Sequence, residues 1–550
     1  MCVDMRQELA RVITTLITCS LLLTGVRADW RPNIVVIVAD DLGYHDVGYH
    51  GAKIRTPNID RLAKEGVRLE NYYVQPVCTP SRSQLMTGRY SIHTGLQHGV
   101  IMPTQPSALP LDSPTLADKL KEVGYTTLAV GKWHLGHYMK KYLPTRRGFD
   151  RFFGFYMGSL DHYTHSRCMY RRCAVDLHDD TPTTFRNVFN ESGVYSTQLF
   201  TRKAVDLINA HSRKKPFFLH LAYQAVHTPL QESGAPTDLK VNYKSGAPTD
   251  LQVNYESGAP TDLQVNYESG APTELKVNYK SVAPTDLQVP KKYTKYYSKL
   301  MRPKRRLYAA MTTAMDEGVG QVVSAIKRKG LWKNTVLVFT TDNGANPGHG
   351  GSNFPLRGKK NQFFEGGIKG VAFVASPLLK VKNYINRGLM HVSDWFPTLI
   401  HVAGGNLRGT KNVSGINQWN AISKHQPSKR HMILHGIDPM DTVLSTTFTS
   451  FNKTFDIRMA AALRIGDYKL ITGATNKASK HKKIFKPSSL VKLYHIGRDP
   501  KEQHNIAQYH MARVKEMLQV LQAYYKTSVP VTYPLSDIVQ PRNSAWGPWR

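Results

Sequence analysis

Two segments of the chain share one pattern of apolar and polar positions. Residues Asn33 to Asp41 read NIVVIVADD, and residues Thr335 to Asn343 read TVLVFTTDN. Each is a short continuous apolar run rich in β-branched residues, which is typical of a strand buried on both faces of a parallel sheet. Each run ends in two oxygen-bearing side chains. Because ligands gather at the carboxyl ends of parallel strands, we expect both polar pairs to face one crevice.

Helical segments alternate with the strand candidates. Residues Ser113 to Val123 have a helical pattern and precede the apolar run TTLAV, and residues Leu307 to Lys329 precede the second of the two apolar runs. Strands and helices that alternate in this way predict a three-layer α/β domain. We assign residues 29–435 to this large domain.

The pattern changes after about Gly436. The stretches AAALRIGDYKLITG and VKLYHIGRDP indicate antiparallel strands, and a helical stretch near Ala507 to Tyr525 follows them. We therefore expect a smaller C-terminal α+β domain over residues 436–550.

Residues 233–290 contain a tandem repeat. SGAPTDLKVNYK recurs in four nearly identical full copies of twelve residues, followed by the fragment SVAPTDLQVP. This period is shorter than the roughly 20 to 50 residues of helical solenoids and propellers. Leu, Val and Tyr alternate with polar residues, so short β-ribbons are one interpretation. We favour a mobile surface insertion, because lengthening a loop costs only about 0.6 kcal/mol per doubling of its length.

The first 28 residues have the pattern of a secretory leader. An apolar run from Val12 to Val26 is followed by small residues, with cleavage expected after Ala28. No later run reaches the roughly 18 to 20 apolar residues that span a bilayer, so we expect no membrane span. Three Asn-x-Ser/Thr sequons fit export and glycosylation, at Asn190, Asn412 and Asn452.

The charge balance is strongly basic. The chain has 73 Lys and Arg against 40 Asp and Glu, a formal net charge of +33. Such a balance favours a polyanionic partner, and a basic but inert surface is the alternative. For an exported protein we expect sulfated polysaccharide and not nucleic acid.

The cysteines divide into a pair and a single residue once the leader has removed two of them. Cys168 and Cys173, in CMYRRC, can bridge across a turn if their α-carbons approach within about 7 Å. Cys78 then has no partner.

The surroundings of Cys78 read PVCTPSRSQLMTGR. Thr79 suits a helix N-cap and Pro80 suits the first turn, so we expect a helix whose amino end lies at the cysteine. A helix amino end has free N–H groups and a partial positive charge, which suit a sulfate or phosphate group.

The string CTPSRSQLMTGR resembles the signature of the type I sulfatases, C-x-P-S-R followed after four residues by T-G-R, and it matches at every fixed position. The resemblance implies an alkaline phosphatase-like fold and a sulfuric ester hydrolase. It also implies that a formylglycine-generating enzyme of the endoplasmic reticulum oxidises Cys78 to formylglycine. One hydroxyl of the aldehyde hydrate attacks sulfur and expels the alcohol, and the other then re-forms the carbonyl and ejects sulfate.

The oxygen-bearing residues at the two strand ends resemble the metal ligands of this family position by position. Carboxylate and amide oxygens suit Ca²⁺, and no Cys/His cluster of zinc spacing occurs in the sequence. The ion would also bind a sulfate oxygen. The expected calcium ligands are Asp40, Asp41, Cys78, Asp342 and Asn343.

Further residues match the active site of the family. Lys132 and His134, two apart in GKWHLG, are implied to steady the diol and the sulfate. His227, in AYQAVHTPLQ, and Lys360, in PLRGKKNQFFEGG, match residues that contact sulfate and protonate the leaving oxygen. Arg82, inside the signature, would offset anionic charge near the cysteine. The identity of the general acid stays open.

Other stretches indicate which branch of the family the sequence resembles most. DDLGYHDVGYHG, SDWFPTL, FVASPLL and the closing WGPW look most like the arylsulfatase B branch, with its close relatives arylsulfatases I and J. This branch implies removal of the 4-sulfate from N-acetylgalactosamine at the ends of dermatan and chondroitin chains. It also implies a lysosomal destination, with secretion as the alternative.

Two departures from this branch bear on the structure. Relatives usually carry several disulfides, whereas here only Cys168 and Cys173 can pair, so the C-terminal domain must hold by packing alone. The repeats begin just after His227, where relatives run directly from PLQ into VP, so the repeats would overhang the substrate entrance.

Other functions compete with this interpretation. A catalytically silent shell could capture polyanions through the basic runs RPKRR at 302–306 and KASKHKK at 477–483. A phosphatase or phosphodiesterase of the wider alkaline phosphatase-like superfamily would use Ser or Thr with two zinc ions, and the cysteine signature argues against it. A sulfatase with a different sugar or an aryl sulfate substrate is a further alternative.

Overall fold

The computed structural model describes residues 31–169, 172–228, 289–443, 454–474 and 487–550, together with short strands between residues 238 and 278. The expected leader at residues 1–28, the sequon at Asn452 and the basic run at 477–483 lie outside the described residues.

A mixed sheet forms the centre of the molecule. Within the described residues it has ten strands in the order β17-β2-β16-β15-β1-β10-β4-β5-β8-β9. Neighbouring parallel strands are β15 (Thr335–Thr341), β1 (Asn33–Ala39), β10 (Phe217–Ala222), β4 (Thr126–Lys132) and β5 (Arg151–Phe155). The flanking strands are β17 (Tyr384–Asn386), β2 (Val67–Leu69), β16 (Ala372–Ala375), β8 (His178–Asp180) and β9 (Phe185–Asn187). The two apolar runs are therefore adjacent parallel strands, β1 and β15.

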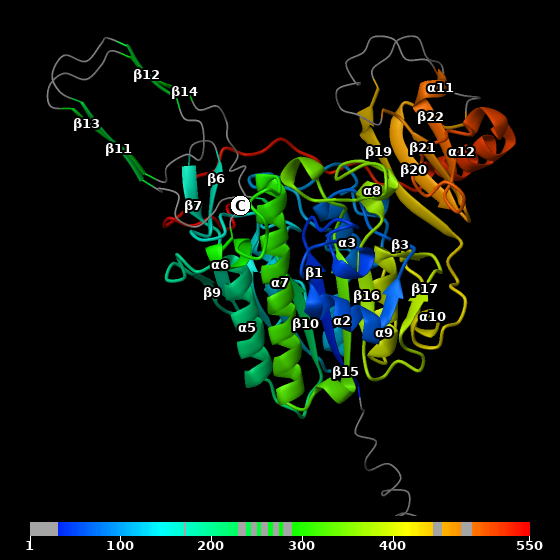
Figure 1. Cartoon of the computed structure of the whole chain (residues 1–550), viewed down its shortest axis with the longest axis horizontal. Coiled ribbons are helices and arrows are strands. Elements are labelled where there is room, and N and C mark those ends of the chain that lie inside the picture. Colours follow the sequence, from blue (N-terminus) through cyan, green and yellow to red (C-terminus); the bar gives the residue numbers. More distant parts are fainter. Residues whose placement is uncertain are drawn as a thin grey trace, which may run out of the picture.

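Helices cover both faces of this sheet, because successive side chains of a strand point to opposite faces. Val35 and Ile37 of β1 belong to the core under α2 (Pro57–Glu65), α5 (Ser196–Ala210) and α7 (Pro303–Arg328). Ile34 and Val36 pack with α3 (Cys78–Thr87), α4 (Leu116–Glu122) and α9 (Trp395–Val402). Helices α5 and α7 lie side by side (Figure 1). The predicted three-layer α/β fold is confirmed.

The C-terminal residues form a second, smaller sheet, at the upper right of Figure 1. Its antiparallel strands are β19 (Met432–Thr442), β20 (Met459–Ile465), β21 (Tyr468–Thr472) and β22 (Val491–His495). Helix α12 (Met511–Lys526) shares a core with them through Val514, Leu518 and Leu521. The expected antiparallel strands and helix are present, although a separate 3-10 turn at Ala507–Tyr509 precedes the helix.

Buried charges join the smaller sheet to the rest of the molecule. The Lys469 Nζ atom, on β21, lies 2.8 Å from Glu365 Oε1 and 2.9 Å from Glu502 Oε1, and all three side chains are fully buried. Glu365 begins α8 (Glu365–Ile368), beyond the central sheet strand β15. The expectation that the C-terminal domain holds by packing alone is wrong, because these ion pairs also connect it.

The tandem repeats contain regular structure. Strand β11 (Asp238–Tyr243) pairs in parallel with β13 (Asp262–Tyr267), and β12 (Asp250–Asn254) pairs in parallel with β14 (Glu274–Asn278). Each pairing joins equivalent positions of alternate repeats, such as Leu239 and Leu263. These ribbons extend away from the α/β body (Figure 1). The described strands are thus short β-ribbons, one of the two interpretations of the repeats, because repeats of nearly identical sequence can pair in register.

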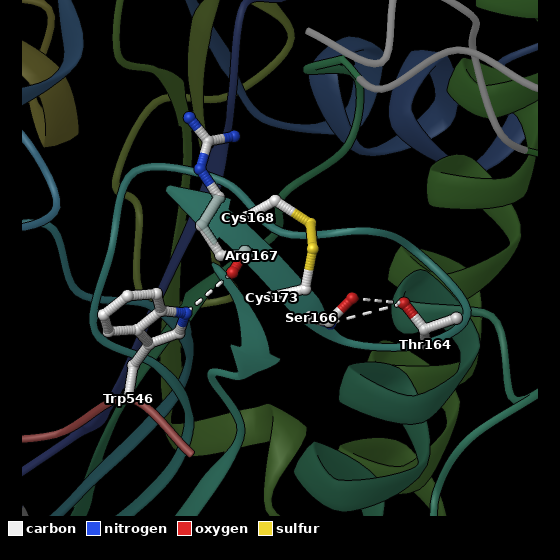
Figure 2. The surroundings of a disulfide bond; sticks show 6 residues. All are labelled: Thr164, Ser166, Arg167, Cys168, Cys173 and Trp546. Carbon is white, nitrogen blue, oxygen red and sulfur yellow. Dashed lines mark hydrogen bonds between the residues drawn. A yellow bond between two sulfur atoms is a disulfide. The ribbon is translucent and has the colours of Figure 1, made fainter. Parts of the chain in front are cut away.

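A disulfide hairpin lies on the opposite side of the molecule from the C-terminal sheet (Figure 1), and Figure 2 shows the disulfide with its neighbours. Strands β6 (Ser166–Met169) and β7 (Arg172–Val175) pair, and Cys168 is bonded to Cys173 with their α-carbons 3.9 Å apart. The C-terminal tail returns to this hairpin, where Trp546 N–H donates to Val175 O at 2.8 Å.

Shorter elements complete the described part of the chain: β3 (Tyr72–Tyr73), β18 (Met390–His391), α6 (Lys291–Thr294), α10 (Trp419–Ser423) and α11 (Pro487–Leu490). Among the described residues, none of the helices has the length and apolar character that crossing a membrane requires.

Candidate active site

The carboxyl ends of β1 and β15 bring the two polar pairs together. Ala39 is paired with Thr341, so Asp40 and Asp342 leave adjacent strands at the same level. The Asp41 N–H donates to Asp342 Oδ1 at 3.3 Å, and all of these side chains are buried. This bond joins residues that are 301 positions apart in the sequence. Parallel pairing of the two strands therefore brings distant residues into one cluster.

Helix α3 begins at Cys78, as predicted, but Thr79 is not its N-cap. The N-cap is Val77, and no side chain caps this end. The Thr79 hydroxyl instead donates to His134 O at 3.2 Å and accepts from Ile101 N–H at 3.2 Å. Thr79 already lies in the first turn, so its hydroxyl ties the helix end to the segment after β4.

The Cys78 side chain lies between an acid and a base. Its Sγ atom is 3.5 Å from Asp40 Oδ1 and 3.6 Å from Lys360 Nζ. Burial, together with the charges of Asp342 and Asp40, raises the pKa of the Cys78 thiol to about 12. The unmodified side chain is therefore a thiol and not the more reactive thiolate.

Each carboxylate of the cluster has a cationic neighbour. Lys132 Nζ is 2.6 Å from Asp40 Oδ2, Lys360 Nζ is 2.6 Å from Asp41 Oδ1, and Arg82 Nη2 is 2.9 Å from Asp342 Oδ2. These pairs are the strong, charge-assisted kind. Arg82, Lys132 and Lys360 thus each pair with a carboxylate of the cluster, and Lys360 also contacts Cys78.

The pKa values of the two neighbouring aspartates diverge. Burial and the charge of Asp342 raise the pKa of Asp40 to about 7, against the opposing effects of Lys132 and Arg82. Burial also acts to raise the pKa of Asp41, but Lys360 and His227 outweigh it and hold that pKa below its usual range. Such divergence within one buried cluster is characteristic of functional sites.

Both predicted histidines face the cluster. His227 Nε2 is 3.7 Å from Asp41 Oδ2, and His227 Nδ1 is 2.7 Å from Thr228 O. His134 Nε2 is 3.0 Å from Ile101 O, whereas its buried Nδ1 has no hydrogen-bond partner among the described residues. Burial lowers the pKa of both imidazoles, so both rings are neutral.

The cluster includes oxygen donors that suit a hard cation. One ligand atom from each of Asp40, Asp41, Cys78 and His227 lies within 4.8 Å of the others. Asn343 Nδ2 donates to Asp41 Oδ1 at 2.7 Å, while Asn343 Oδ1 is buried and has no hydrogen-bond partner among the described residues. A buried amide oxygen without a donor, beside two carboxylates, suits Ca²⁺.

Asp342 is placed differently from the other expected ligands. Its Oδ2 atom accepts from Arg82 Nε at 3.0 Å and from Arg82 Nη2 at 2.9 Å. Of the expected calcium ligands, the structure therefore brings Asp40, Asp41, Cys78 and Asn343 together directly and holds Asp342 at their edge. His227, which the sequence comparison assigned to sulfate, also belongs to the cluster.

A protein-family model described as Sulfatase matches residues 32–405. The chain belongs to the sulfatase family. Arylsulfatase J of Mus musculus is 38% identical to this sulfatase over 96% of the chain and 81% of the relative. N-acetylgalactosamine-6-sulfatase of Mus musculus is 26% identical over 94% of the chain and 90% of the relative.

Solved structures agree with this assignment. The crystal structure of Ps i-CgsB has a TM-score of 0.68 and 26% identity, and covers 92% of the chain and 94% of that protein. The PsFucS1 sulfatase from Pseudoalteromonas sp. shares the fold, with a TM-score of 0.63 and 22% identity over 92% of each chain. The sulfatase is thus an enzyme that hydrolyses sulfate esters.

Some supporting residues of the sulfatase site carried no signal in the sequence. His162 Nε2 is 3.1 Å from His227 O, and Gln224 Nε2 donates to Leu160 O at 2.7 Å. These contacts hold the His227 segment against residues 160–162. His162 lies 65 positions before His227, and no motif connects the two. Only an alignment of relatives could have indicated them in advance.

Proposed function

We propose that this sulfatase removes 4-sulfate from N-acetylgalactosamine in glycosaminoglycans, by means of a formylglycine made from Cys78 and a bound Ca²⁺ ion. The observation that carries the proposal is the position of Cys78. It lies at the amino end of α3 inside the complete sulfatase signature, with Asp40 Oδ1 at 3.5 Å and Lys360 Nζ at 3.6 Å.

The chemistry of the bound groups is that of the family. The formylglycine hydrate supplies a nucleophilic hydroxyl, and Ca²⁺ held by Asp40, Asp41, Asn343 and residue 78 supplies a Lewis acid for a sulfate oxygen. The chain itself supplies the surrounding charge. Lys132, Lys360 and Arg82 place three cations around the position of the sulfate, and they are already oriented by buried carboxylates. Fixed charges of this kind stabilise an anionic transition state without reorganisation.

The hydrogen bonds indicate which group carries a proton. Ile101 O and Thr228 O accept from His134 Nε2 and His227 Nδ1, so these ring nitrogens bear the protons of the neutral imidazoles. The other nitrogen of each ring is then an acceptor. Lys360 Nζ is the donor in its contact with Cys78 Sγ, so it bears a proton. We infer that Lys360 protonates the leaving oxygen and that His134 Nδ1 accepts a proton.

Glycan substrates are supported by the relatives and by charge. One relative is an N-acetylgalactosamine-6-sulfatase, and Ps i-CgsB has been solved in complex with k-i-k-neocarrahexaose. The net charge of +33 favours a polyanionic glycan. The basic run at 302–306 is in part committed to the fold, because Arg305 is paired with the buried Asp46, which weakens the alternative of a silent polyanion-binding shell.

A secretory route, with a lysosomal destination, belongs to the same proposal. The Cys168–Cys173 disulfide fits an oxidising compartment, and the sequon residues Asn190 and Asn412 are exposed as glycosylation requires. These features support export, and they are equally compatible with secretion from the cell.

Mass analysis of the tryptic peptide that spans Cys78 tests the mechanism. We expect the mass of formylglycine, and we expect Cys78→Ala to abolish hydrolysis of 4-nitrophenyl sulfate while the protein stays folded. Matched disaccharides that carry the 4-sulfate or the 6-sulfate then test the substrate, with faster turnover of the 4-sulfate expected. An active protein with only unmodified thiol at position 78 would contradict the formylglycine route.

A further inference from the structure

A further arginine, in the disulfide hairpin, takes no part in the contacts described so far. Arg167 is in strand β6 of the disulfide hairpin, and Figure 2 shows its side chain extending away from the disulfide and from Trp546. Arg167 Nη1 donates to Ser159 Oγ at 2.9 Å. Its Nε atom is buried and has no hydrogen-bond partner among the described residues.

No carboxylate of the described residues forms an ion pair with Arg167. Burial lowers the pKa of its guanidinium, and only the more distant charge of Asp176 opposes this effect. Asp176 is already engaged, because its Oδ1 atom is 2.9 Å from His178 Nε2 and its Oδ2 atom accepts from Met157 N–H at 2.9 Å. The side chain of Arg167 as a whole is only partly buried, so its charge is accessible to an anionic ligand.

The segment that holds Arg167 runs between the two histidines of the site. Ser159 follows Gly158, whose α-carbon packs against the His134 ring, since a Cβ at this position would lie 2.7 Å from His134 Cε1. Three residues after Ser159, His162 Nε2 is 3.1 Å from His227 O. Through Ser159, Arg167 therefore contacts the segment that packs against His134 and His227, and it lies on a different element from Lys132, Lys360 and Arg82.

The main chain of Arg167 is held rigidly. Trp546 Nε1, from the C-terminal tail, donates to Arg167 O at 2.7 Å, and the next residue is in the Cys168–Cys173 disulfide (Figure 2). Binding groups that are fixed before the ligand arrives lose little conformational entropy on binding. The hairpin and the tail thus position the guanidinium.

We propose that Arg167 binds a second anionic group of the substrate, on the sugar next to the one that carries the scissile sulfate. The planar guanidinium matches the paired oxygens of a carboxylate or of a sulfate, and both groups occur along sulfated polysaccharides. The proposal rests on the glycan substrate proposed above and makes Arg167 the residue that selects an acidic neighbouring sugar.

Steady-state kinetics of Arg167→Gln against three substrates tests the proposal. The first is 4-nitrophenyl sulfate, the second is sulfated N-acetylgalactosamine alone, and the third is the same sugar linked to a uronic acid. We expect KM for the uronic acid substrate to rise about 10- to 100-fold, the range for a lost hydrogen bond to a charged group. We expect kcat, and both constants for the other two substrates, to change by less than about threefold.

Two comparisons sharpen this experiment. Methyl esterification of the uronic acid, or a second sulfate in its place, shows which anion Arg167 prefers, and the neutral ester should be insensitive to Arg167→Gln. Arg151→Gln is the matched control, because Arg151 is exposed, lies on β5 and is paired with Asp179. It removes one positive charge and should leave all three substrates unaffected.

Equal losses on all three substrates, or equal kcat/KM of the wild-type enzyme for neutral and acidic sugars, would overturn the assignment of Arg167. Failure of the wild-type enzyme to hydrolyse any sulfated sugar, despite turnover of 4-nitrophenyl sulfate, would instead overturn the glycan substrate itself. Thermal unfolding of both variants establishes that the differences do not come from misfolding.

Discussion

Single residues in the site differ mainly in what already occupies their polar atoms. Lys132, Lys360 and Arg82 are each paired with a buried aspartate, whereas Asn343 Oδ1 and His134 Nδ1 have no hydrogen-bond partner among the described residues. Buried polar atoms without a hydrogen-bond partner that lie beside a cluster of carboxylates are candidate contacts for an ion or a substrate. They distinguish the groups that hold charge in place from those that contact ion and substrate.

Substitution of Lys360 separates proton transfer from sulfate binding. A general acid matters most when the leaving group is a poor one, so Lys360→Gln should lower kcat for a sugar sulfate by about 10²- to 10⁴-fold. The loss for 4-nitrophenyl sulfate, whose phenolate leaves without protonation, should be much smaller. Equal losses on both substrates would place Lys360 in sulfate binding alone.

Removal of the metal provides a second test at this scale. Ca²⁺ at 100 times its dissociation constant should stabilise the folded enzyme by about 2.7 kcal/mol, because it binds the native state alone. We therefore expect EGTA to lower the Tm of the wild-type enzyme. Asp40→Asn should abolish this response, whereas Asp179→Asn, which changes a surface partner of Arg151, should preserve it. A response that survives in Asp40→Asn would place the ion elsewhere.

Elements contribute by delivering distant residues to one place. The parallel pairing of β1 with β15 delivers the aspartates, α3 delivers the cysteine, and the segment after β10 delivers His227. The smaller sheet is attached in a similar way, by β21. Its Lys469 is buried between Glu365 and Glu502, and one ammonium group cannot fully compensate two carboxylates.

This imbalance predicts a pH dependence of stability. Burial raises the pKa of Glu502 to about 7, against the attraction of Lys469, while Lys469 and Arg464 outweigh burial and lower the pKa of Glu365 to about 2. Between about pH 7 and the ordinary pKa of glutamate near 4.5, the folded state binds more protons at Glu502 than the unfolded state does. Glu502 should therefore stabilise the folded state more as the pH falls from 7.5 to 5, and Glu365 starts to oppose it only below that range. Buried histidines such as His134 and His227, whose pKa values burial lowers, act in the opposite direction, so the effect of Glu502 is measured against a variant that lacks its carboxylate.

Chemical unfolding of the wild type and of Glu502→Gln at pH 7.5 and pH 5 measures this effect. Because both proteins share the buried histidines, the stability of the wild type relative to the variant should rise between pH 7.5 and pH 5. Lys469→Met should destabilise the enzyme by about 3–5 kcal/mol at pH 7.5, since it leaves buried charges unpaired. A difference in stability between wild type and variant that stays constant, or that falls on acidification to pH 5, would contradict the role given to Glu502.

At the scale of the whole molecule, the C-terminal tail and the repeats differ in how they are attached to the fold. The C-terminal tail crosses from the smaller sheet to the disulfide hairpin (Figure 1), with the Thr532 N–H bonded to Gly95 O and the Trp546 N–H bonded to Val175 O. The described strands of the repeats pair only with one another. The tail is therefore integrated into the fold, while the repeats form a separate appendage.

Deletion of residues 232–288, which joins Gln231 to Val289, tests this distinction. Because strands β11 to β14 share no ladder with the central sheet, the Tm should change by no more than a few degrees. Turnover of 4-nitrophenyl sulfate should persist, and a change confined to polymeric substrates would show that the repeats act at the substrate entrance. Removal of residues 544–550 is the contrasting variant and should destabilise the hairpin that carries Arg167.

The chemistry of the site followed largely from the linear sequence. Continuous apolar runs identified β1 and β15, and the signature around Cys78 identified the family, because both depend on neighbouring residues alone. The same holds for Lys132 and His134, which are fixed relative to one another by a short motif. The prediction that Thr79 is the N-cap of α3 was wrong. Its hydroxyl instead forms hydrogen bonds with His134 O and Ile101 N–H, and these two residues are distant from it in the sequence.

Only the tertiary structure determined the features that arise from contacts between distant segments. No local sequence pattern indicates that Asp342 pairs with Arg82 or that His227 joins the cluster around Cys78. The same is true of the burial of Lys469 and of the hydrogen bond from Arg167, which has no ion-pair partner among the described residues, to Ser159. Burial and the strength of a charge pair are properties of the surrounding volume, which only the folded chain defines. The residue types capable of sulfate chemistry were thus readable in order along the chain, whereas their partners and protonation states required the fold.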